Sequence, residues 1–276
     1  MKIVKHSGAI VDFNRAKLKQ SLLKSGAASA VVDDILQLIE KDIHDGISTK
    51  HIFKTAFRLL KKTSNSNAAR YNLREAIRLL GPSGFFFEKF IARLFTSEHY
   101  ETKVNLILRG KCVSHEIDVL VKNNNGIAMV ECKFHVGKDV ATDVKVPMYI
   151  LSRFNDLKEA KHEIFSRSDT ISKCWIVTNN RFTSDAVDFA KCSGLNLLSW
   201  DYPKTDNLKT KISNRQLYPI TCLTTLTLSE KEKLLILDII LVREIVNNSN
   251  DLERIGLSPN RIKNVMKEAL ELCRLM

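Results

Sequence analysis

The sequence contains no Cys-x-x-Cys pair, although it has six cysteines in 276 residues. No His and Cys residues have the spacing of zinc ligands either, which argues against a zinc site. A Gly-rich phosphate loop is also missing, which excludes the P-loop class of nucleotide hydrolases. The longest apolar run, residues 234–242, is too short to cross a membrane and contains Asp238. With free thiols and no signal peptide, these absences predict a cytoplasmic protein with no membrane partner.

Positive charge is what the sequence has in excess. The chain has 43 Lys and Arg against 31 Asp and Glu, a net charge of +12 and a pI of about 9.4. Of this excess, +8 lies in residues 1–83, +2 in residues 84–205 and +2 in residues 206–276. Such a balance is typical of nucleic-acid-binding proteins, although solvated basic faces are also common. The excess therefore points to a polyanionic partner and lies mainly in the first third of the chain.

The clearest break in the chain is Gly81-Pro82-Ser83-Gly84, because glycine and proline both end helices. It predicts an N-terminal domain of residues 1–83, a central domain of residues 84–205 and a C-terminal domain of residues 206–276. The first domain is expected to be mostly helical after a short β-hairpin that turns at Ser7-Gly8. Its expected helices cover residues 14–25, 30–42, 48–61 and 68–80.

A second β-hairpin is predicted over residues 117–134, where two aliphatic runs flank the turn residues Asn123-Asn124-Asn125-Gly126. If Lys122 pairs with Ile127, the register of the whole hairpin follows. A slip by two residues would keep the same side chains on each face, whereas a slip by one would exchange the faces.

In this register Asp118 lies opposite Glu131 and shares a face with Lys133, together with Leu120 and Met129. Strands often carry solvated Glu and Lys on an outer sheet face, and that interpretation stays open. Two carboxylates and an ammonium group on one face are, however, the side chains of a divalent-metal site.

The segment before the hairpin, residues 84–95, predicts a helix that is apolar on almost every side and therefore buried. Glu88 shares a face with Ile91 and Phe95, where a carboxylate is costly unless it is paired or bound to metal. The elements expected next are a strand over 103–108, the hairpin, a helix over 144–163, a strand over 174–178, a helix over 184–192 and a strand over 196–200. Their order, αβββαβαβ, predicts a mixed α/β fold.

Four segments of the central domain together resemble a known family: Phe87-Glu88, His115-Glu116-Ile117-Asp118, Val130-Glu131-Cys132-Lys133 and Leu197-Leu198-Ser199-Trp200-Asp201-Tyr202-Pro203. They resemble the Mrr-like restriction endonuclease branch of the PD-(D/E)xK nuclease superfamily. The resemblance implies hydrolysis of phosphodiester bonds assisted by Mg²⁺ or Mn²⁺. Asp118 and Glu131 would bind the metal, Lys133 would orient the attacking water, and Glu88 would bind metal through water or position a second ion.

Related nucleases often carry Gln-x-x-x-Tyr on the following helix. Here Tyr149 fits the pattern, and Lys145 stands in place of Gln, where a cation could contact a phosphate. His115 and His135 flank the site in sequence. His135 shares a face with Glu131 and Lys133 and could touch substrate, but because histidines at strand ends are usually ordinary surface residues, a catalytic role for it is not favoured.

The N-terminal domain is similar to the ATP-cone, a nucleotide-binding regulatory module known from ribonucleotide reductases. The matching segments are Val4-Lys5-His6-Ser7-Gly8, Phe13-Asn14-Arg15-Ala16-Lys17, Asp45-Gly46-Ile47-Ser48-Thr49 and Ala69-Arg70-Tyr71-Asn72-Leu73. The similarity implies that Lys5, Asn14, Lys17 and Thr49 contact ATP or dATP, with His6 where the family commonly has Arg. Lysines near a helix N-terminus, which itself favours anions, suit phosphate groups. Solvated surface lysines are the alternative.

The C-terminal domain is expected to contain a helix over 229–246, capped by Ser229 with Glu232, and a final helix over 260–275. Between them, Ile255-Gly256-Leu257-Ser258 resembles half of a helix–hairpin–helix motif, which contacts DNA backbone through main-chain amides. A helical oligomerisation or capping domain is the favoured alternative.

The sequence thus predicts a nucleotide-regulated, metal-dependent endonuclease that acts on DNA, with ATP or dATP as effector. Defence against foreign DNA is expected by family analogy alone. A double-strand break needs two active sites, so a homo-oligomer is expected. The alternatives are a non-catalytic, nucleotide-sensing DNA-binding regulator that keeps the nuclease scaffold, and a nuclease directed at RNA.

Overall fold

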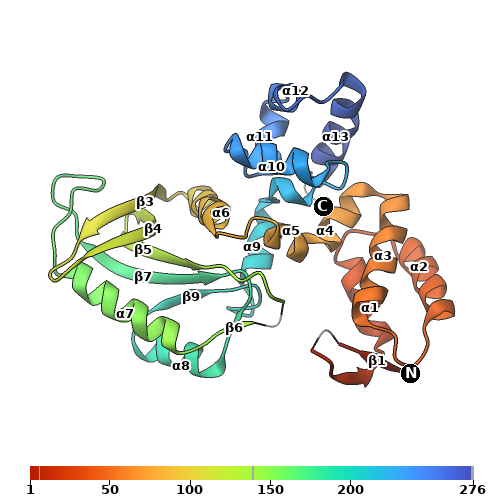
Figure 1. Ribbon diagram of the computed structural model, residues 1–276, viewed down its shortest axis with the longest axis horizontal. Coiled ribbons are helices and arrows are strands. Elements are labelled where there is room, and N and C mark those ends of the chain that lie inside the picture. The colour runs from red at the N-terminus through yellow and green to blue at the C-terminus, as the bar shows by residue number, and fades with distance from the viewer. Residues whose placement is uncertain (6, 139, 275–276) are drawn as a thin grey trace. The chain divides into compact units, whose positions relative to one another are not determined.

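A computed structural model describes residues 1–5, 7–138 and 140–274 of the chain (Figure 1). The contacts within it divide the chain into two compact units. One unit is the continuous segment Arg78–Leu217, which is called the sheet unit below. The other combines Met1–Ile77 with the residues from Tyr218 onward and is called the helical unit. The predicted site residue His6 lies outside the described residues.

The sheet unit is built on a mixed five-stranded sheet of order β3-β4-β5-β7-β9. β3, β4 and β5 are antiparallel neighbours, whereas β5, β7 and β9 run parallel. The strands are β3 (Glu101–Arg109), β4 (Ser114–Asn123), β5 (Gly126–Lys133), β7 (Ile171–Thr178) and β9 (Asn196–Leu198). A separate parallel pair is formed by β6 (Ala141–Thr142) and β8 (Arg181–Phe182).

Helices cover both faces of this sheet (Figure 1). α7 (Lys145–Lys158) and α8 (Ser184–Cys192) pack on one face, where Met129 and Ile176 of the sheet share a buried cluster with Ile150 of α7. Because side chains alternate along a strand, Trp175 of β7 points the other way and meets Phe95 of α6 (Phe85–Ser97), with ring centroids 5.8 Å apart. The result is a three-layer α/β/α unit.

These elements confirm the predicted mixed α/β fold and the order αβββαβαβ, with β6 and β8 as short additions. The predicted register is also confirmed, because Lys122 pairs with Ile127 in the β4–β5 ladder. The strand over 103–108 is longer than predicted, and the helix over 144–163 ends earlier, at Lys158.

The boundary of the sheet unit lies at Leu217, whereas the sequence suggested a new domain from residue 206. The reason is α9 (Leu208–Arg215), which is tied to the end of α6. Lys211 Nζ lies 2.7 Å from Glu98 Oε1, and an Arg215 guanidinium nitrogen donates to the Ser97 carbonyl at 3.0 Å. These polar contacts hold the segment after the last strand within the sheet unit.

The helical unit begins with the hairpin of β1 (Lys2–Val4) and β2 (Ile10–Asp12), as predicted. Its first helices bury a shared apolar cluster that includes Leu22, Leu36 and Leu60, none of which is exposed to solvent. The helices of the first segment are α1 (Arg15–Leu23), α2 (Ser29–Asp42), α3 (Thr49–Thr63), α4 (Asn65–Tyr71) and α5 (Leu73–Arg78), the last of which ends at the unit boundary. The second segment adds η1 (Ile220–Cys222), α10 (Leu228–Ile236), α11 (Val242–Asn247), α12 (Asn250–Arg254) and α13 (Pro259–Leu272).

The two segments of the helical unit are held together by specific hydrogen bonds, although the sequence suggested separate domains. An Arg70 guanidinium nitrogen donates to the carbonyls of Glu271 (2.9 Å) and Leu272 (3.3 Å) at the end of α13. In addition, Thr221 Oγ1 donates to the Ala76 carbonyl at 2.6 Å. The two segments therefore form one packed body.

Two predictions of a continuous helix are wrong. The helix over 68–80 is interrupted at Asn72, whose backbone (φ −89°, ψ 7°) leaves the helical region. The helix over 229–246 divides into α10 and α11 around Asp238, which has a φ of 63°. Between the two helices, the N–H of Ile240 donates to the Glu244 carboxylate, while its carbonyl accepts from the N–H of Ile220. The backbone pairing of Ile240 with Ile220 therefore interrupts a segment whose local sequence favours one continuous helix.

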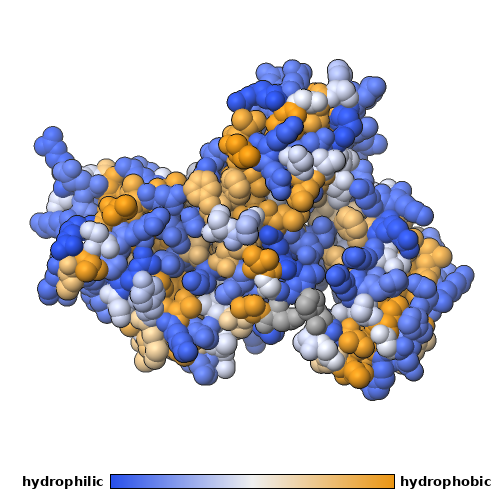
Figure 2. Space-filling model, in the orientation of Figure 1, coloured by the Kyte–Doolittle hydropathy of each residue, from blue (hydrophilic) through white to orange (hydrophobic). Residues whose placement is uncertain are grey.

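Hydrophilic residues cover most of the visible face of the protein, with hydrophobic residues in scattered small groups (Figure 2). Among the described residues, no helix is both long and apolar enough to cross a membrane.

The contacts of Glu268 on α13 allow the packing of the helical unit to be tested. Its carboxylate is 1% exposed and accepts hydrogen bonds from Thr224 N–H at 2.8 Å and from Thr225 N–H and Oγ1 at 2.9 and 2.7 Å. The change Glu268→Ala leaves these donors without an acceptor, so we expect the free energy of unfolding to fall by about 3 kcal/mol. Thermal melts beside the exposed control Glu253→Ala measure the effect, and equal melting temperatures would contradict it.

Candidate functional site

The β4–β5 turn fixes which side chains meet at the far end of the hairpin. Asn123 Oδ1 accepts from Asn125 N–H at 2.9 Å, and Gly126 adopts a φ of 111°, which a residue with a Cβ rarely adopts. From this turn the ladder runs to Val119 opposite Val130. Beyond that pair the Asp118 carboxylate takes up the next backbone donor of β5, because it accepts from the N–H of Cys132 at 2.7 Å.

Three predicted residues are brought together here: Asp118 on β4, Glu131 on β5 and Glu88 on the first turn of α6. Burial raises the pKa of Asp118. Burial and the Asp118 charge raise the pKa of Glu131 to about 7. The pKa of Glu88 is also raised to about 7, by burial and then by the charges of Asp118, Glu116 and Glu131. The ionised forms of these carboxylates are therefore destabilised, and a cation bound beside them would stabilise them.

Arg153 on α7 supplies one cation that the sequence analysis missed. Its guanidinium donates to Glu131 Oε2 at 2.6 Å and also to the Glu116 carbonyl. Both side chains of the ion pair are shielded, with 11% of Arg153 and 15% of Glu131 exposed. No motif marks this arginine, because only the packing of α7 against the sheet brings it to Glu131.

The other predicted residues around the site are exposed. Lys133 is exposed at the end of β5, two residues beyond Glu131, and its positive charge lowers the pKa of both Asp118 and Glu131. Tyr149 on α7 is 63% exposed, and the Arg153 guanidinium lies 5.7 Å from its ring centroid. Lys145 is exposed at the start of the same helix. These side chains are available to a ligand that approaches the carboxylates.

The two flanking histidines have structural partners. His115 Nε2 lies 2.8 Å from Asp156 Oδ2, in a pair that is almost buried, and this contact holds the pKa of Asp156 well below its usual range. His135 Nε2 lies 2.9 Å from Thr142 Oγ1, and burial lowers the pKa of His135. Both residues therefore join β4 and β5 to neighbouring segments.

The donor set of the site fits a hard divalent cation. Within the described part of the chain, no three His, Cys, Asp or Glu side chains lie close enough together to hold a metal ion. Mg²⁺, however, typically takes only one or two carboxylates and completes its octahedron with water and substrate phosphate. Asp118 and Glu131 supply two such carboxylates, both destabilised as anions by burial. A cation between them would relieve that cost.

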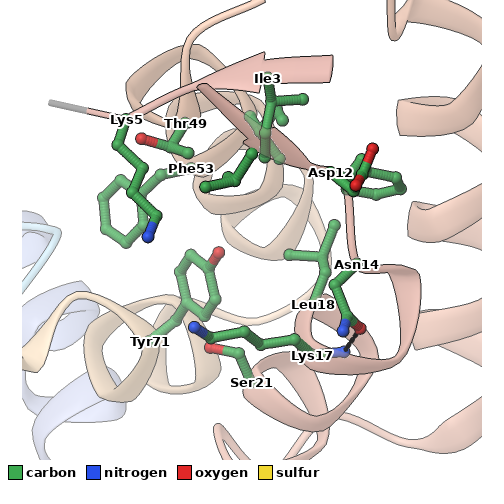
Figure 3. Close-up of a pocket in the computed structure, with 13 residues that line it drawn as sticks. Ile3, Lys5, Asp12, Asn14, Lys17, Leu18, Ser21, Thr49, Phe53 and Tyr71 are labelled. Carbon is green, nitrogen blue, oxygen red and sulfur yellow. Dashed lines mark hydrogen bonds between the residues drawn. The ribbon is translucent and has the colours of Figure 1, made fainter. Parts of the chain in front are cut away.

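A second candidate site is a pocket of about 400 Å³ in the helical unit (Figure 3). Its walls come from the β1–β2 hairpin, α1, α3 and the end of α4. A backbone hydrogen bond of 3.0 Å from Val4 to Ile47 holds the first strand beside the start of α3. The residues that line the pocket include four that were predicted from sequence, namely Lys5, Asn14, Lys17 and Thr49.

Cationic and aromatic side chains lie close together in the pocket. Figure 3 shows the ammonium groups of Lys5 and Lys17 extending into it from β1 and α1. The rings of Phe53 and Tyr71 stack beside them, with centroids 4.9 Å apart and an interplanar angle of 15°. Asn14 has a further role, because its Oδ1 accepts from Lys17 N–H at 2.8 Å and caps α1.

The aromatic pair was not predicted as part of the site. Tyr71 belongs to a segment that supports the similarity to the ATP-cone, but its place in the pocket follows only from the packing of α4 against α3. Burial raises its pKa to about 12, so its hydroxyl stays neutral.

Two family models match the chain. A restriction endonuclease model matches residues 79–202, and a model described as AF1548-like, C-terminal matches residues 218–273. The first match covers the whole strand order and the carboxylate site, and the second covers the C-terminal segment of the helical unit. Neither match extends into residues 1–78.

An uncharacterized protein of Archaeoglobus fulgidus is 34% identical over 180 residues, which is 65% of this chain and 97% of the relative. The crystal structure of the protein of unknown function AF1548 has 32% identity and a TM-score of 0.57, and covers 68% of this chain and 97% of that one. The chain belongs to the AF1548-like family. The restriction endonuclease AspBHI, described as DNA modification-dependent, is far less similar (12% identity, TM-score 0.31, covering 74% of this chain and 40% of that one).

This AF1548-like protein thus carries a restriction-endonuclease domain in its sheet unit. Domains of this kind are nucleases, and the nuclease assignment is the coarse function that the comparisons support.

The effect of the raised Glu88 pKa on stability can be measured without an activity assay. Its pKa of about 7 lies above the ordinary value of 4.5, so folding takes up a proton between these values and stability falls as the pH rises through that window. In a chelating buffer, Glu88→Gln should melt at a higher temperature than wild type at about pH 8, and the gain should vanish near pH 4. The exposed control Glu101→Gln should show no such pH dependence. A Glu88→Gln gain that is the same at both pH values would contradict the raised pKa.

Proposed function

We propose that this protein is a metal-dependent endonuclease that hydrolyses phosphodiester bonds in DNA and is regulated by an adenine nucleotide. The observation that carries the nuclease proposal is the meeting of Asp118, Glu131 and Glu88 beside Lys133, inside a restriction-endonuclease domain. Three half-buried carboxylates with one exposed ammonium group suit a cation and a phosphate far better than they suit a structural core. Retention of all four residues argues against a nuclease fold kept only as a scaffold.

Each residue has a role in this proposal. Asp118 and Glu131 would hold Mg²⁺ or Mn²⁺, which polarises the phosphate and lowers the pKa of bound water. Lys133 would orient the attacking water and stabilise the charge that develops on the phosphate oxygens. Glu88 would bind metal through water or position a second ion. Arg153 fixes the orientation of Glu131 through its 2.6 Å contact.

The pocket of the helical unit supports the nucleotide part of the proposal. Lys17 lies in the first turn of α1, and Lys5 lies next to Thr49 at the start of α3 (Figure 3). Lysines near helix N-termini suit a polyphosphate, since a helix N-terminus adds favourable partial positive charge. The stacked rings of Phe53 and Tyr71 offer an apolar surface for a base. In this assignment Lys5, Lys17, Asn14 and Thr49 contact ATP or dATP, which acts as an effector and is not hydrolysed.

Regulation has a structural route within the helical unit. Tyr71, which lines the pocket, is adjacent in α4 to Arg70, which binds the last carbonyls of α13. A nucleotide that moves Tyr71 would therefore act on the C-terminal segment, and coupling of this kind is reciprocal. A double-strand break also requires two active sites, so we propose a homo-oligomer as the acting particle. Defence against foreign DNA is the proposed biological role.

The nuclease proposal predicts that Lys133→Ala and Asp118→Ala each reduce cleavage on the order of 10²–10³-fold. Lys133→Ala would remove a cation beside the reacting phosphate and Asp118→Ala would remove a metal ligand, while DNA binding should stay within a few-fold. Single-turnover cleavage of DNA with Mg²⁺ measures the rate, with Lys173→Ala as an exposed-lysine control on β7 and a chelator as the metal-free control.

Cleavage at the wild-type rate by either variant would show that the residues are wrongly assigned. DNA binding by the wild type without cleavage under any metal would instead favour the non-catalytic regulator. Cleavage of RNA alone would change the substrate class.

The nucleotide proposal predicts that Lys5→Ala and Lys17→Ala weaken binding of ATP or dATP at least several-fold, because each removes a cation from the phosphate side of the pocket. Calorimetry should use the full chain, since the N-terminal segment packs with the C-terminal one. Lys24→Ala on the exposed end of α1 is the control. No heat from any adenine nucleotide at millimolar concentration would show that the pocket has another ligand.

A further inference from the structure

Four cations form a continuous line along α3 that neither candidate site uses. Lys50, Lys54, Arg58 and Lys62 follow one another at intervals of four residues, so they lie on one side of the helix. All four are exposed, and the helix contains no Asp or Glu. This set is called the basic ridge below.

Some other cations of the same unit are paired with carboxylates, whereas the basic ridge is a regular row of cations without acidic neighbours on its helix. On α1, Arg15 lies 2.5 Å from Glu40 and Lys19 lies 2.7 Å from Asp33, both on α2. Within the described residues, no member of the basic ridge forms an ion pair. The basic ridge thus places four of the 15 positive charges of residues 1–83 on one side of a helix that has no acidic residue.

The basic ridge is unfavourable for the isolated protein. Like charges four residues apart destabilise a helix by about 0.2–0.5 kcal/mol per pair, and the basic ridge contains three such pairs. Lys50 also lies in the first turn, where the helix dipole disfavours a cation, although Lys62 in the last turn is favoured. A polyanion along the helix would offset these repulsions.

The dimensions fit a nucleic-acid backbone. Twelve residues separate the first and last cation, which at about 1.5 Å per residue gives a line of about 18 Å. Duplex DNA carries a charge about every 1.7 Å along its axis, so several phosphates lie within that length. A membrane surface fits less well, because the apolar face of α3, with Ile52, Ala56 and Leu60, is already buried in the core.

We propose that the basic ridge of α3 binds the phosphate backbone of DNA and gives the protein a contact with its substrate outside the restriction-endonuclease domain. This rests on the proposed function only in taking DNA as the partner. The contact is electrostatic and reads no base, because lysine and arginine on phosphates position a protein without selecting a sequence. It therefore adds affinity and salt dependence and leaves sequence choice to other elements.

The test is the salt dependence of DNA binding by the full chain in chelating buffer, where no cleavage occurs. The quadruple variant Lys50→Gln, Lys54→Gln, Arg58→Gln and Lys62→Gln keeps good helix formers on α3. A matched control replaces four other exposed lysines of the helical unit with Gln and so removes the same charge, namely Lys24, Lys41, Lys263 and Lys267. Circular dichroism melts confirm that both variants fold.

We expect the slope of log K against log salt to become shallower by up to about 3.6 in the basic-ridge variant, because each phosphate that a cation neutralises contributes about 0.9 to the slope. The affinity should fall uniformly across DNA sequences, and the control variant should keep nearly the wild-type slope. Equal slopes for the two variants would overturn the proposal, as would a wild type that binds RNA and not DNA.

The outcome can be separated from that of the nuclease proposal. Wild-type cleavage of DNA with Mg²⁺, together with equal slopes for both variants, would leave the nuclease intact and reject the basic ridge. A shallower slope for the basic-ridge variant alone, with no cleavage by the wild type, would support the basic ridge and reject the nuclease.

Discussion

The register of the β4–β5 hairpin is the constraint on which the central site depends. Because side chains alternate along a strand, the pairing of Lys122 with Ile127 decides that Asp118 and Glu131 meet and that Lys133 stands beside them. A slip of β5 by one residue would separate Glu131 and Lys133 from Asp118 and bring Val130 and Cys132 to the Asp118 face instead. The short turn ending at Gly126 therefore controls a site at the other end of the strands.

That register also brings carboxylates close together, and other residues of the sheet unit compensate part of their negative charge. Burial raises the pKa of Asp118, and burial with mutual repulsion raises the pKa values of Glu131 and Glu88 to about 7. Arg153 compensates Glu131, and Lys133 contributes from an exposed position. A divalent cation, as in the proposed function, would offset the remaining negative charge, so the same imbalance that costs stability would favour binding of a metal.

In the helical unit the organising element is α4, a short helix with contacts on two sides. Its Tyr71 stacks on Phe53 in the pocket, and its Arg70 binds the end of α13. The AF1548-like C-terminal segment is thus joined to the N-terminal pocket by two neighbouring residues. Within the C-terminal segment, backbone donors are satisfied by the buried Glu268 carboxylate.

Local patterns in the sequence predicted the hairpin turn, its register and the order of elements along the sheet unit, because turn chemistry and side-chain period act over a few residues. The pocket residues Lys5, Asn14, Lys17 and Thr49 were indicated by the resemblance to the ATP-cone. Four features follow only from tertiary contacts. The Arg153 guanidinium binds Glu131, and Tyr71 lines the pocket. In addition, α9 is bonded to the end of α6, and the two end segments of the chain pack into one unit. The helix expected over 229–246 divides for the same reason. Contacts between residues far apart in the chain set these outcomes, and no local pattern encodes them.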